Sequence, residues 1–155
     1  MTKKTIKTSN VLNVYNILNA AKYSKMDDDD KIKVWKIVRA MKPVATKFDE
    51  DMKDASEKLK PTDDYNERLQ KAQEYEYLRS QNKPTSDVMA DKEYEAFIKE
   101  FRSYSKVVED AIKEFGDKEV EITFDAISEK SFGKLMASND WNMDQVTKVS
   151  EFVLE

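Results

Sequence analysis

The strongest pattern in the sequence is a heptad repeat that predicts a long helix in the second half of the chain. Seven residues recur at alternating spacings of three and four positions, as the a/d seam of a coiled coil does. They are Tyr94, Phe97, Phe101, Tyr104, Val108, Ala111 and Phe115. Gly116 follows directly, and we expect it to end the helix as a C′ glycine. A helix from Asp87 to Phe115 with such a seam needs a partner helix that buries it.

A second long helix, from Asp28 to Leu59, is predicted to be that partner. Its recurring apolar residues are Ile32, Trp35, Val38, Met41, Ala45, Phe48, Met52, Ala55 and Leu59. At a rise of 1.5 Å per residue this helix would be about 48 Å long and the other about 43 Å long. The two lengths match well enough for the helices to pair along their whole extent.

Charged residues make up 37 % of the chain, with only two glycines and three prolines, a composition typical of long amphipathic helices. The segment from Thr62 to Asn82 predicts one more helix on its apolar positions Leu69, Ala72, Tyr75 and Leu78. The pattern leaves open whether this segment forms a third bundle helix or caps the tip of a two-helix hairpin.

After Gly116 the apolar period changes from helical to two, which indicates a strand with one buried face, from Glu119 to Phe124. A lone strand is unstable, and the only other candidate is Lys4–Thr8, so we expect these two to pair and bring the chain ends together. Short helices are predicted from Ser9 to Tyr23, Ser128 to Ala137 and Asn142 to Leu154, the last with a capping box.

The predicted fold class is mainly α (α+β). It consists of a long antiparallel helical hairpin or three-helix coiled coil, a small two-stranded β element and short C-terminal helices. We expect a single domain over residues 1–155. Residues 9–116 form the helical hairpin region, and residues 117–155 supply the strand and two short helices that pack near the N-terminus.

The residue types needed for most catalytic and metal sites are missing from this sequence. It has no histidine and no cysteine, so it lacks the commonest general base and the usual zinc ligands. Its glycines stand only at positions 116 and 133, too few for a phosphate-binding loop or a dinucleotide fingerprint. We therefore predict a protein that is not an enzyme, with no catalytic residue, cofactor, metal or small-molecule substrate.

Charge and hydropathy argue against two further classes of partner. The net charge is −4 with the two signs interleaved, whereas a nucleic-acid-binding protein normally presents a basic face. No stretch approaches the roughly 18 apolar residues of a membrane span, and the N-terminus shows no signal-peptide pattern. We expect no nucleic-acid or membrane partner, and synthesis in the cytoplasm.

The four aspartates Asp27–Asp30 invite comparison with a cation site. An EF-hand loop starting at Asp27 would need glycine and glutamate where the chain has Ile32 and Val38. Acids in a first helical turn complement the positive end of the helix dipole. We therefore interpret the run as a solvated helix start.

Three residues are candidate contacts for a protein partner. Tyr77 lies off the apolar stripe of its helix and Trp141 lies in a loop, and large aromatic residues dominate interface hot spots. Trp141 is equally well explained as a plug that closes the core. Ile122 marks the predicted strand, whose unpaired edge could accept a strand from another chain, although the terminal helices could instead cover it.

The order of these parts resembles small bacteriophage proteins of unknown function that are encoded among structural and tail-assembly genes. The resemblance lies in the short N-terminal helix, the charged helical hairpin, the E-V-E-I strand (Glu119–Ile122) and the terminal F-V-L-E (Phe152–Glu155). It implies a virion component or a head or tail assembly factor that binds phage structural proteins, made in the host cytoplasm and incorporated into the virion. An inhibitor of a host or defence protein is the alternative, and homo-oligomerisation stays open.

Overall fold

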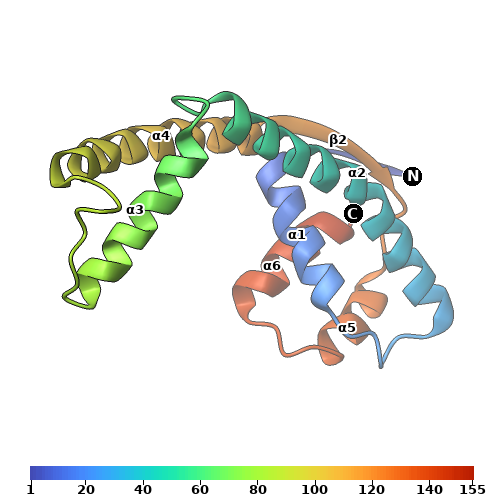
Figure 1. Cartoon of the computed structure of the whole chain (residues 1–155). Coiled ribbons are helices and arrows are strands. Elements are labelled where there is room, and N and C mark those ends of the chain that lie inside the picture. The colour runs from blue at the N-terminus through green and yellow to red at the C-terminus, as the bar shows by residue number, and fades with distance from the viewer. The chain divides into compact units, whose positions relative to one another are not determined.

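The computed structural model describes all residues from Met1 to Glu155 and is mainly helical, with a small two-stranded antiparallel sheet (Figure 1). The predicted fold class is thus confirmed. In chain order the elements are β1 (Thr2–Lys7), α1 (Thr8–Ala20), α2 (Asp28–Lys58), α3 (Tyr65–Ser80), α4 (Asp91–Asp117), β2 (Glu119–Phe124), α5 (Glu129–Ala137) and α6 (Met143–Val153).

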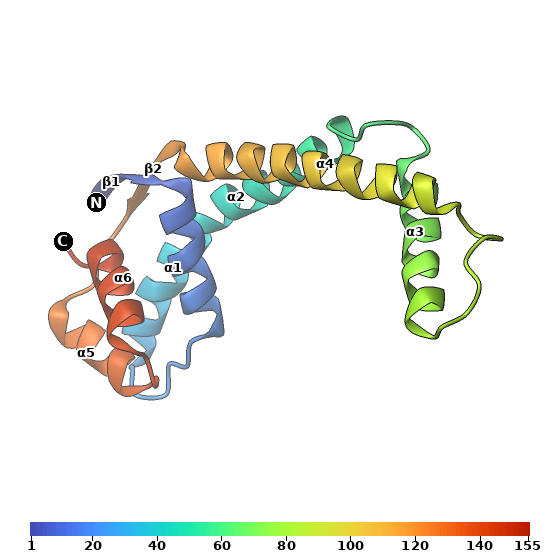
Figure 2. The ribbon, with the colours of Figure 1, turned by 90° about the vertical axis from the view of Figure 1, so that its left-hand side faces the viewer.

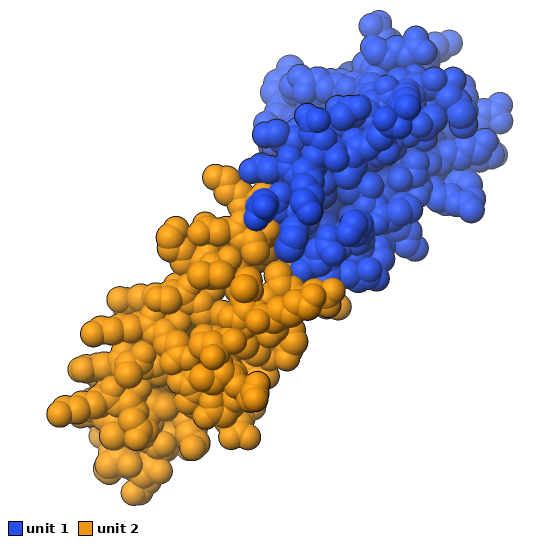
Figure 3. All heavy atoms as spheres, turned by 90° about the horizontal axis from the view of Figure 1, so that it is seen from above, with its two compact units in different colours: residues 1–51, 114–155 blue, residues 52–113 orange.

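The chain divides into two compact units whose boundaries fall inside α2 and α4 (Figure 3). The first unit contains Met1–Asp51 and Glu114–Glu155, and the second contains Met52–Lys113. This division differs from the predicted regions 9–116 and 117–155, because the first unit takes most of α2 as well as both ends of the chain. A single domain over 1–155 stays a prediction.

In the first unit, β1 pairs antiparallel with β2 from Thr2 opposite Phe124 to Lys7 opposite Glu119. The predicted strand pairing is therefore confirmed. The backbone N–H of Thr8 continues the ladder by donating to the carbonyl of Lys118 at 2.8 Å, and α1 begins at that point. Alternation along β2 buries Ile122 and Phe124 and leaves Glu119, Glu121 and Thr123 exposed.

The core of the first unit lies between this sheet and helices α1, α2, α5 and α6. Figures 1 and 2 both show α1 and α6 side by side. Its fully buried side chains include Leu18, Ile37, Met41, Leu135 and Phe152.

Lys4 links the two ends of the chain. Its Nζ donates to the carbonyls of Glu151, Phe152 and Leu154 at 2.8, 2.8 and 2.6 Å, at the C-terminus of α6. A cation there satisfies unpaired carbonyls and complements the negative end of the helix dipole. Partial burial lowers the pKa of the Lys4 ammonium.

Helix α2 buries only part of the stripe that its apolar spacing suggested. The residues that enter the core are Val34, Ile37, Met41 and Ala45, whereas Trp35 is 56 % exposed and Ile32 50 % exposed. The prediction was right for Met41 and Ala45 but wrong for Ile32 and Trp35, because three steps of three residues, from Ile32 to Met41, turn the side-chain direction by about 180° at 3.6 residues per turn. Ile32 and Met41 therefore point to opposite sides.

The second unit consists of α3, most of α4 and the last turns of α2. Helix α3 packs on α4 through Tyr65, Ala72 and Phe97, which form the buried cluster of this unit. The ring centroid of Tyr65 lies 5.6 Å from that of Phe97 and 4.9 Å from that of Tyr104. The segment between Pro61 and Pro84 thus contains a helix, Tyr65–Ser80, that packs against α4.

Two predictions about α4 are wrong. Phe101 was placed in a buried seam but is 39 % exposed, because the Tyr65 ring packs over Phe97 and Tyr104 and leaves the outer side of Phe101 in solvent. Gly116 was expected at C′ but lies inside α4, which ends at Asp117. It is buried close to α1, where a Cβ at position 116 would lie 3.5 Å from the Cβ of Ser9.

Candidate functional site

The best candidate site is the exposed side of α2 in the first unit. Four residues recur there at spacings of four, four and three, which places them along one line of the helix surface: Lys31, Trp35, Arg39 and Lys42. Ile32 lies beside this line. We call these five residues the Trp35 face.

Large apolar side chains are left in solvent on the Trp35 face. Trp35 and Ile32 are each at least half exposed, and the guanidinium carbon of Arg39 lies 5.3 Å from the centroid of the Trp35 ring. Arg39 therefore holds the indole by a cation–π contact without covering it. An exposed tryptophan with an apolar neighbour is the kind of surface that anchors protein interfaces.

A hollow of about 320 Å³ opens beside Trp35, between α2, the end of α1 and the loop that follows α1. Its lining is Leu18, Asn19, Tyr23, Lys31, Trp35 and Val38. The hydroxyl of Tyr23 donates to the carbonyl of Leu18, and burial raises the pKa of that phenol. The hollow is therefore mostly apolar, with one cation at its margin, and suits an apolar side chain better than a reacting polar substrate.

The stretch of α2 that carries the Trp35 face contains basic residues and no acidic residue, and the exposed acid Asp28 stands one turn before it. Between positions 31 and 48 the chain carries only cations and no acidic residue: Lys31, Lys33, Lys36, Arg39, Lys42 and Lys47. All of them are exposed. Ion pairs reach only Lys31, 3.9 Å from Asp28, and Lys47, 3.1 Å from Asp51. The interleaving of charge that holds for the whole sequence thus fails here, and we call residues 31–47 the basic segment.

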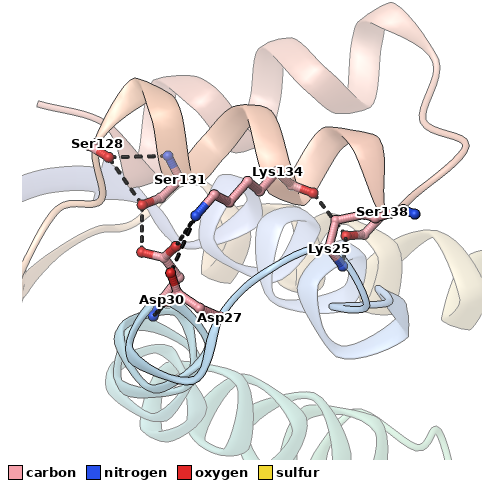
Figure 4. Close-up of polar contacts among 7 residues, drawn as sticks. All are labelled: Lys25, Asp27, Asp30, Ser128, Ser131, Lys134 and Ser138. Carbon is pink, nitrogen blue, oxygen red and sulfur yellow. Dashed lines mark hydrogen bonds and ion pairs between the residues drawn. The ribbon is translucent and has the colours of Figure 1, made fainter.

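A second cluster of polar residues joins the start of α2 to α5 (Figure 4). The Ser131 hydroxyl donates to Asp30 Oδ1 at 2.6 Å, and Lys134 Nζ lies 3.4 Å from Asp30 Oδ2 and 3.3 Å from Asp27 Oδ2. Asp30 is buried, so the interpretation of the aspartate run as a solvated start is wrong for this residue. Its partners lie about 100 positions further on in the sequence and could not be foreseen from spacing.

The contacts within this cluster stabilise the charged forms of Asp27 and Lys134. The backbone N–H of Asp30 donates to Asp27 at 2.9 Å and, together with Lys134, lowers the pKa of the Asp27 carboxyl. The hydrogen bond from Lys134 to Asp27, followed in effect by the one to Asp30, raises the pKa of the Lys134 ammonium. Because Asp30 and Ser131 are both buried, they cannot reach a substrate. We interpret the cluster as a joint that fixes α2 against α5.

The three residues predicted to contact a partner do not form one site. Tyr77, on α3 in the second unit, is 61 % exposed, as an anchor residue should be. Trp141 is half-buried against the core of the first unit, where it also lines a hollow with Ile17 and Asn139. Ile122 is buried in the same core, so its side chain is not available on the strand surface. Binding by any of the three stays a prediction.

Sequence reasoning missed the Trp35 face because it assigned Trp35 and Ile32 to a buried stripe. Two signals in the sequence could have found the face. One is the absence of acidic residues from 31 to 48, and the other is a second apolar stripe, from Val34 to Ala45, that accounts for the core without Trp35.

No group of three or more acidic, histidine or cysteine side chains is arranged to hold a metal ion. None of the helices has the length and apolar character needed to cross a membrane. Comparisons with protein-family models, with curated proteins and with solved structures found no match to this chain.

Proposed function

We propose that this protein is a non-enzymatic binding protein whose Trp35 face is its contact surface for another protein. The observation that carries the proposal is Trp35 itself, a tryptophan left 56 % exposed on helix α2 beside a mostly apolar hollow. Burying such a ring in a partner's surface removes a large apolar area from water, at roughly 25 cal/mol per Å².

The chemistry of the surface supports binding over catalysis. The hollow at Trp35 is lined by one cation, one amide and one phenol besides its apolar walls, and the phenol already donates to a backbone carbonyl. It offers no carboxylate or activated nucleophile for acid–base or covalent chemistry. The Asp30–Ser131 pair is equally unsuited, since both residues are buried and their polar atoms are already paired with each other.

For the biological role we keep the expectation raised by the resemblance to phage proteins. The proposal is a virion component or a head or tail assembly factor, made in the host cytoplasm, that binds phage structural proteins. A small inhibitor of a host or defence protein is the alternative, and the same exposed tryptophan would serve it equally well.

Site-specific photocrosslinking tests this proposal. Ile32 on the Trp35 face and Val107 on α4 are both about half exposed, so each is replaced in turn by p-benzoylphenylalanine in phage-infected cells that make the full chain. We expect an adduct with a defined protein from position 32 and none from position 107, and mass spectrometry identifies it. Capsid, portal or tail proteins would support assembly, and one host protein would support the inhibitor. Equal or absent adducts at the two positions would refute the proposal.

A further inference from the structure

We infer that the partner segment bound at the Trp35 face is acidic and carries one apolar or aromatic side chain that fills the hollow beside Trp35. This inference rests on the proposed function and names the chemistry of the partner. It is drawn from the charge of the basic segment, an observation separate from the exposure of Trp35.

The basic segment is an excess of positive charge on a protein whose net charge is −4. Its cations follow one another over about 24 Å of helix, at 1.5 Å per residue. Lys31, Arg39 and Lys42 lie on the line of Trp35, whereas the other three cations lie about 100° or more around the helix from it. Lys33, Lys36, Arg39 and Lys42 have no ion-pair partner within 4.0 Å, in contrast to Lys31 and Lys47 at the two ends of the segment. Like charges at helical spacing repel one another, and carboxylates on a bound segment would relieve that repulsion.

The positions of the cations relative to the hollow set the pattern expected in the partner. Lys31 lies at the margin of the hollow, and Arg39 and Lys42 continue the same line of the helix beyond Trp35. A single apolar side chain seated in the hollow would thus have carboxylate-binding groups on both sides of it. Arg39 can grip a carboxylate with two parallel hydrogen bonds while its guanidinium stays over the Trp35 ring.

Acidic residues flank the basic segment at both ends. Asp27–Asp30 precede it and Asp49–Asp51 follow it, counting Glu50 between them. A duplex or an anionic membrane extends beyond 24 Å and would meet the acids at both ends, whereas a short acidic peptide segment centred on Trp35 would meet only Asp28, beside Lys31. The face also offers one exposed tryptophan rather than the series of aromatic platforms on which single-stranded nucleic acid stacks. An acidic protein segment therefore fits this surface better than a nucleic acid or a lipid surface.

Tryptophan fluorescence gives a direct test, because the chain has only two tryptophans. In a Trp141→Phe variant of the full chain, emission reports Trp35 alone. The probe is a synthetic peptide of glutamates with one central phenylalanine. We expect saturable quenching or a blue shift of Trp35, weakened about tenfold or more when serine replaces the phenylalanine, and lost when glutamine replaces the glutamates. Raising the ionic strength should weaken binding, since salt screens exposed charges.

Matched charge reversals locate the effect. Arg39→Glu with Lys42→Glu should abolish peptide binding, whereas Lys92→Glu with Lys99→Glu, on exposed positions of α4, changes the net charge by the same amount and should leave binding intact. Thermal melting checks that each variant is folded. Equal loss in both variants, or quenching by oligo(dT) or phosphatidylserine vesicles as strong as by the peptide, would overturn the inference.

The remaining outcomes separate the two proposals. A protein adduct at position 32 without peptide binding would refute the acidic partner and leave the proposed function standing. The protein could also self-associate without peptide in a concentration-dependent way that Arg39→Glu with Lys42→Glu abolishes. That result would show that the acidic segment comes from a second copy of this chain, and it would overturn the inference of a separate acidic partner.

Discussion

Each of the two units of this protein is stabilised internally by a different kind of side chain. The first unit buries a cluster of 15 apolar residues, most of them aliphatic. The buried cluster of the second has three members, Tyr65, Ala72 and Phe97, with half-buried aromatic and aliphatic side chains around it. The first unit therefore rests on close packing of aliphatic groups from elements far apart in sequence, whereas the second relies more on aromatic rings and the polar groups they carry.

Polar contacts of the second unit involve charged partners. The Tyr75 hydroxyl donates to Asp91 Oδ1 at 2.6 Å, and Arg68 donates to both oxygens of Glu100 at 2.9 and 2.7 Å. Such contacts respond to pH and salt far more than aliphatic packing does. We expect the second unit to open locally before the first, in line with its smaller apolar core.

Removal of a core ring from the first unit should have the largest effect. Phe152 is fully buried, and its ring stacks on Phe124 with the centroids 5.2 Å apart. Phe152→Ala should lower the free energy of unfolding by about 3–5 kcal/mol, measured by urea denaturation. Phe101→Ala on the half-exposed side of α4 should cost less than about 1 kcal/mol. Similar losses for the two would contradict the contrast between the units.

The joint between α2 and α5 should matter less than the core but more than a surface charge. Asp30→Ala leaves the buried Ser131 hydroxyl without its acceptor and Lys134 without one of its carboxylates, so we expect a loss of about 1–3 kcal/mol in urea denaturation. Asp29, an exposed neighbour in the same helical turn, is the control, and Asp29→Ala should change stability by at most about 0.5 kcal/mol. Equal effects would show that Asp30 acts only through the helix dipole.

The elements that were correctly predicted depend on local patterns. The period-two alternation of Glu119–Phe124 could belong only to a strand, and one other segment was free to pair with it. The capping box of α6 is likewise local, since Asn142 accepts from the N–H of Gln145 and the Gln145 side chain accepts from the N–H of Asn142. Short-range spacing is enough to specify such features.

The features that sequence reasoning missed depend on tertiary packing, that is, on which side of a helix the neighbouring elements cover. Helix α2 has apolar residues on two sides, and only the packing of the rest of the first unit decides that Val34 and Ile37 are buried while Trp35 is not. Gly116, the last residue but one of α4, likewise lies against α1, a neighbour that its spacing in the sequence did not reveal. The candidate site was missed for this reason.

Alkaline pH should loosen the second unit through its tyrosines. The Tyr94 hydroxyl donates to the carboxylate of Glu76, which raises the pKa of Tyr94 to about 12. A folded-state pKa above the unfolded value of about 10 means that this stabilisation is complete below pH 10 and is lost as the pH rises through about 12. We expect a loss of helical circular dichroism over that interval that is smaller in Tyr94→Phe. If the alkaline transition is unchanged in Tyr94→Phe, the loss of helix must be caused by the ionisation of groups other than Tyr94.

The smallest change in stability should come from removing a single tyrosine hydroxyl in the second unit. The sign of that change should differ between Tyr65 and Tyr75. The Tyr65 hydroxyl is buried without a hydrogen-bond partner, and burial is the first cause of the raised pKa of this phenol. Tyr65→Phe keeps the ring contacts with Phe97 and removes an unsatisfied polar group, so stability should stay unchanged or rise by up to about 1 kcal/mol. Tyr75→Phe makes the same chemical change but removes a hydrogen bond to Asp91, and it should lower stability. Thermal melting of the two variants side by side measures the difference, and a loss at Tyr65 as large as that at Tyr75 would mean that the Tyr65 hydroxyl has a hydrogen-bonding partner in solution.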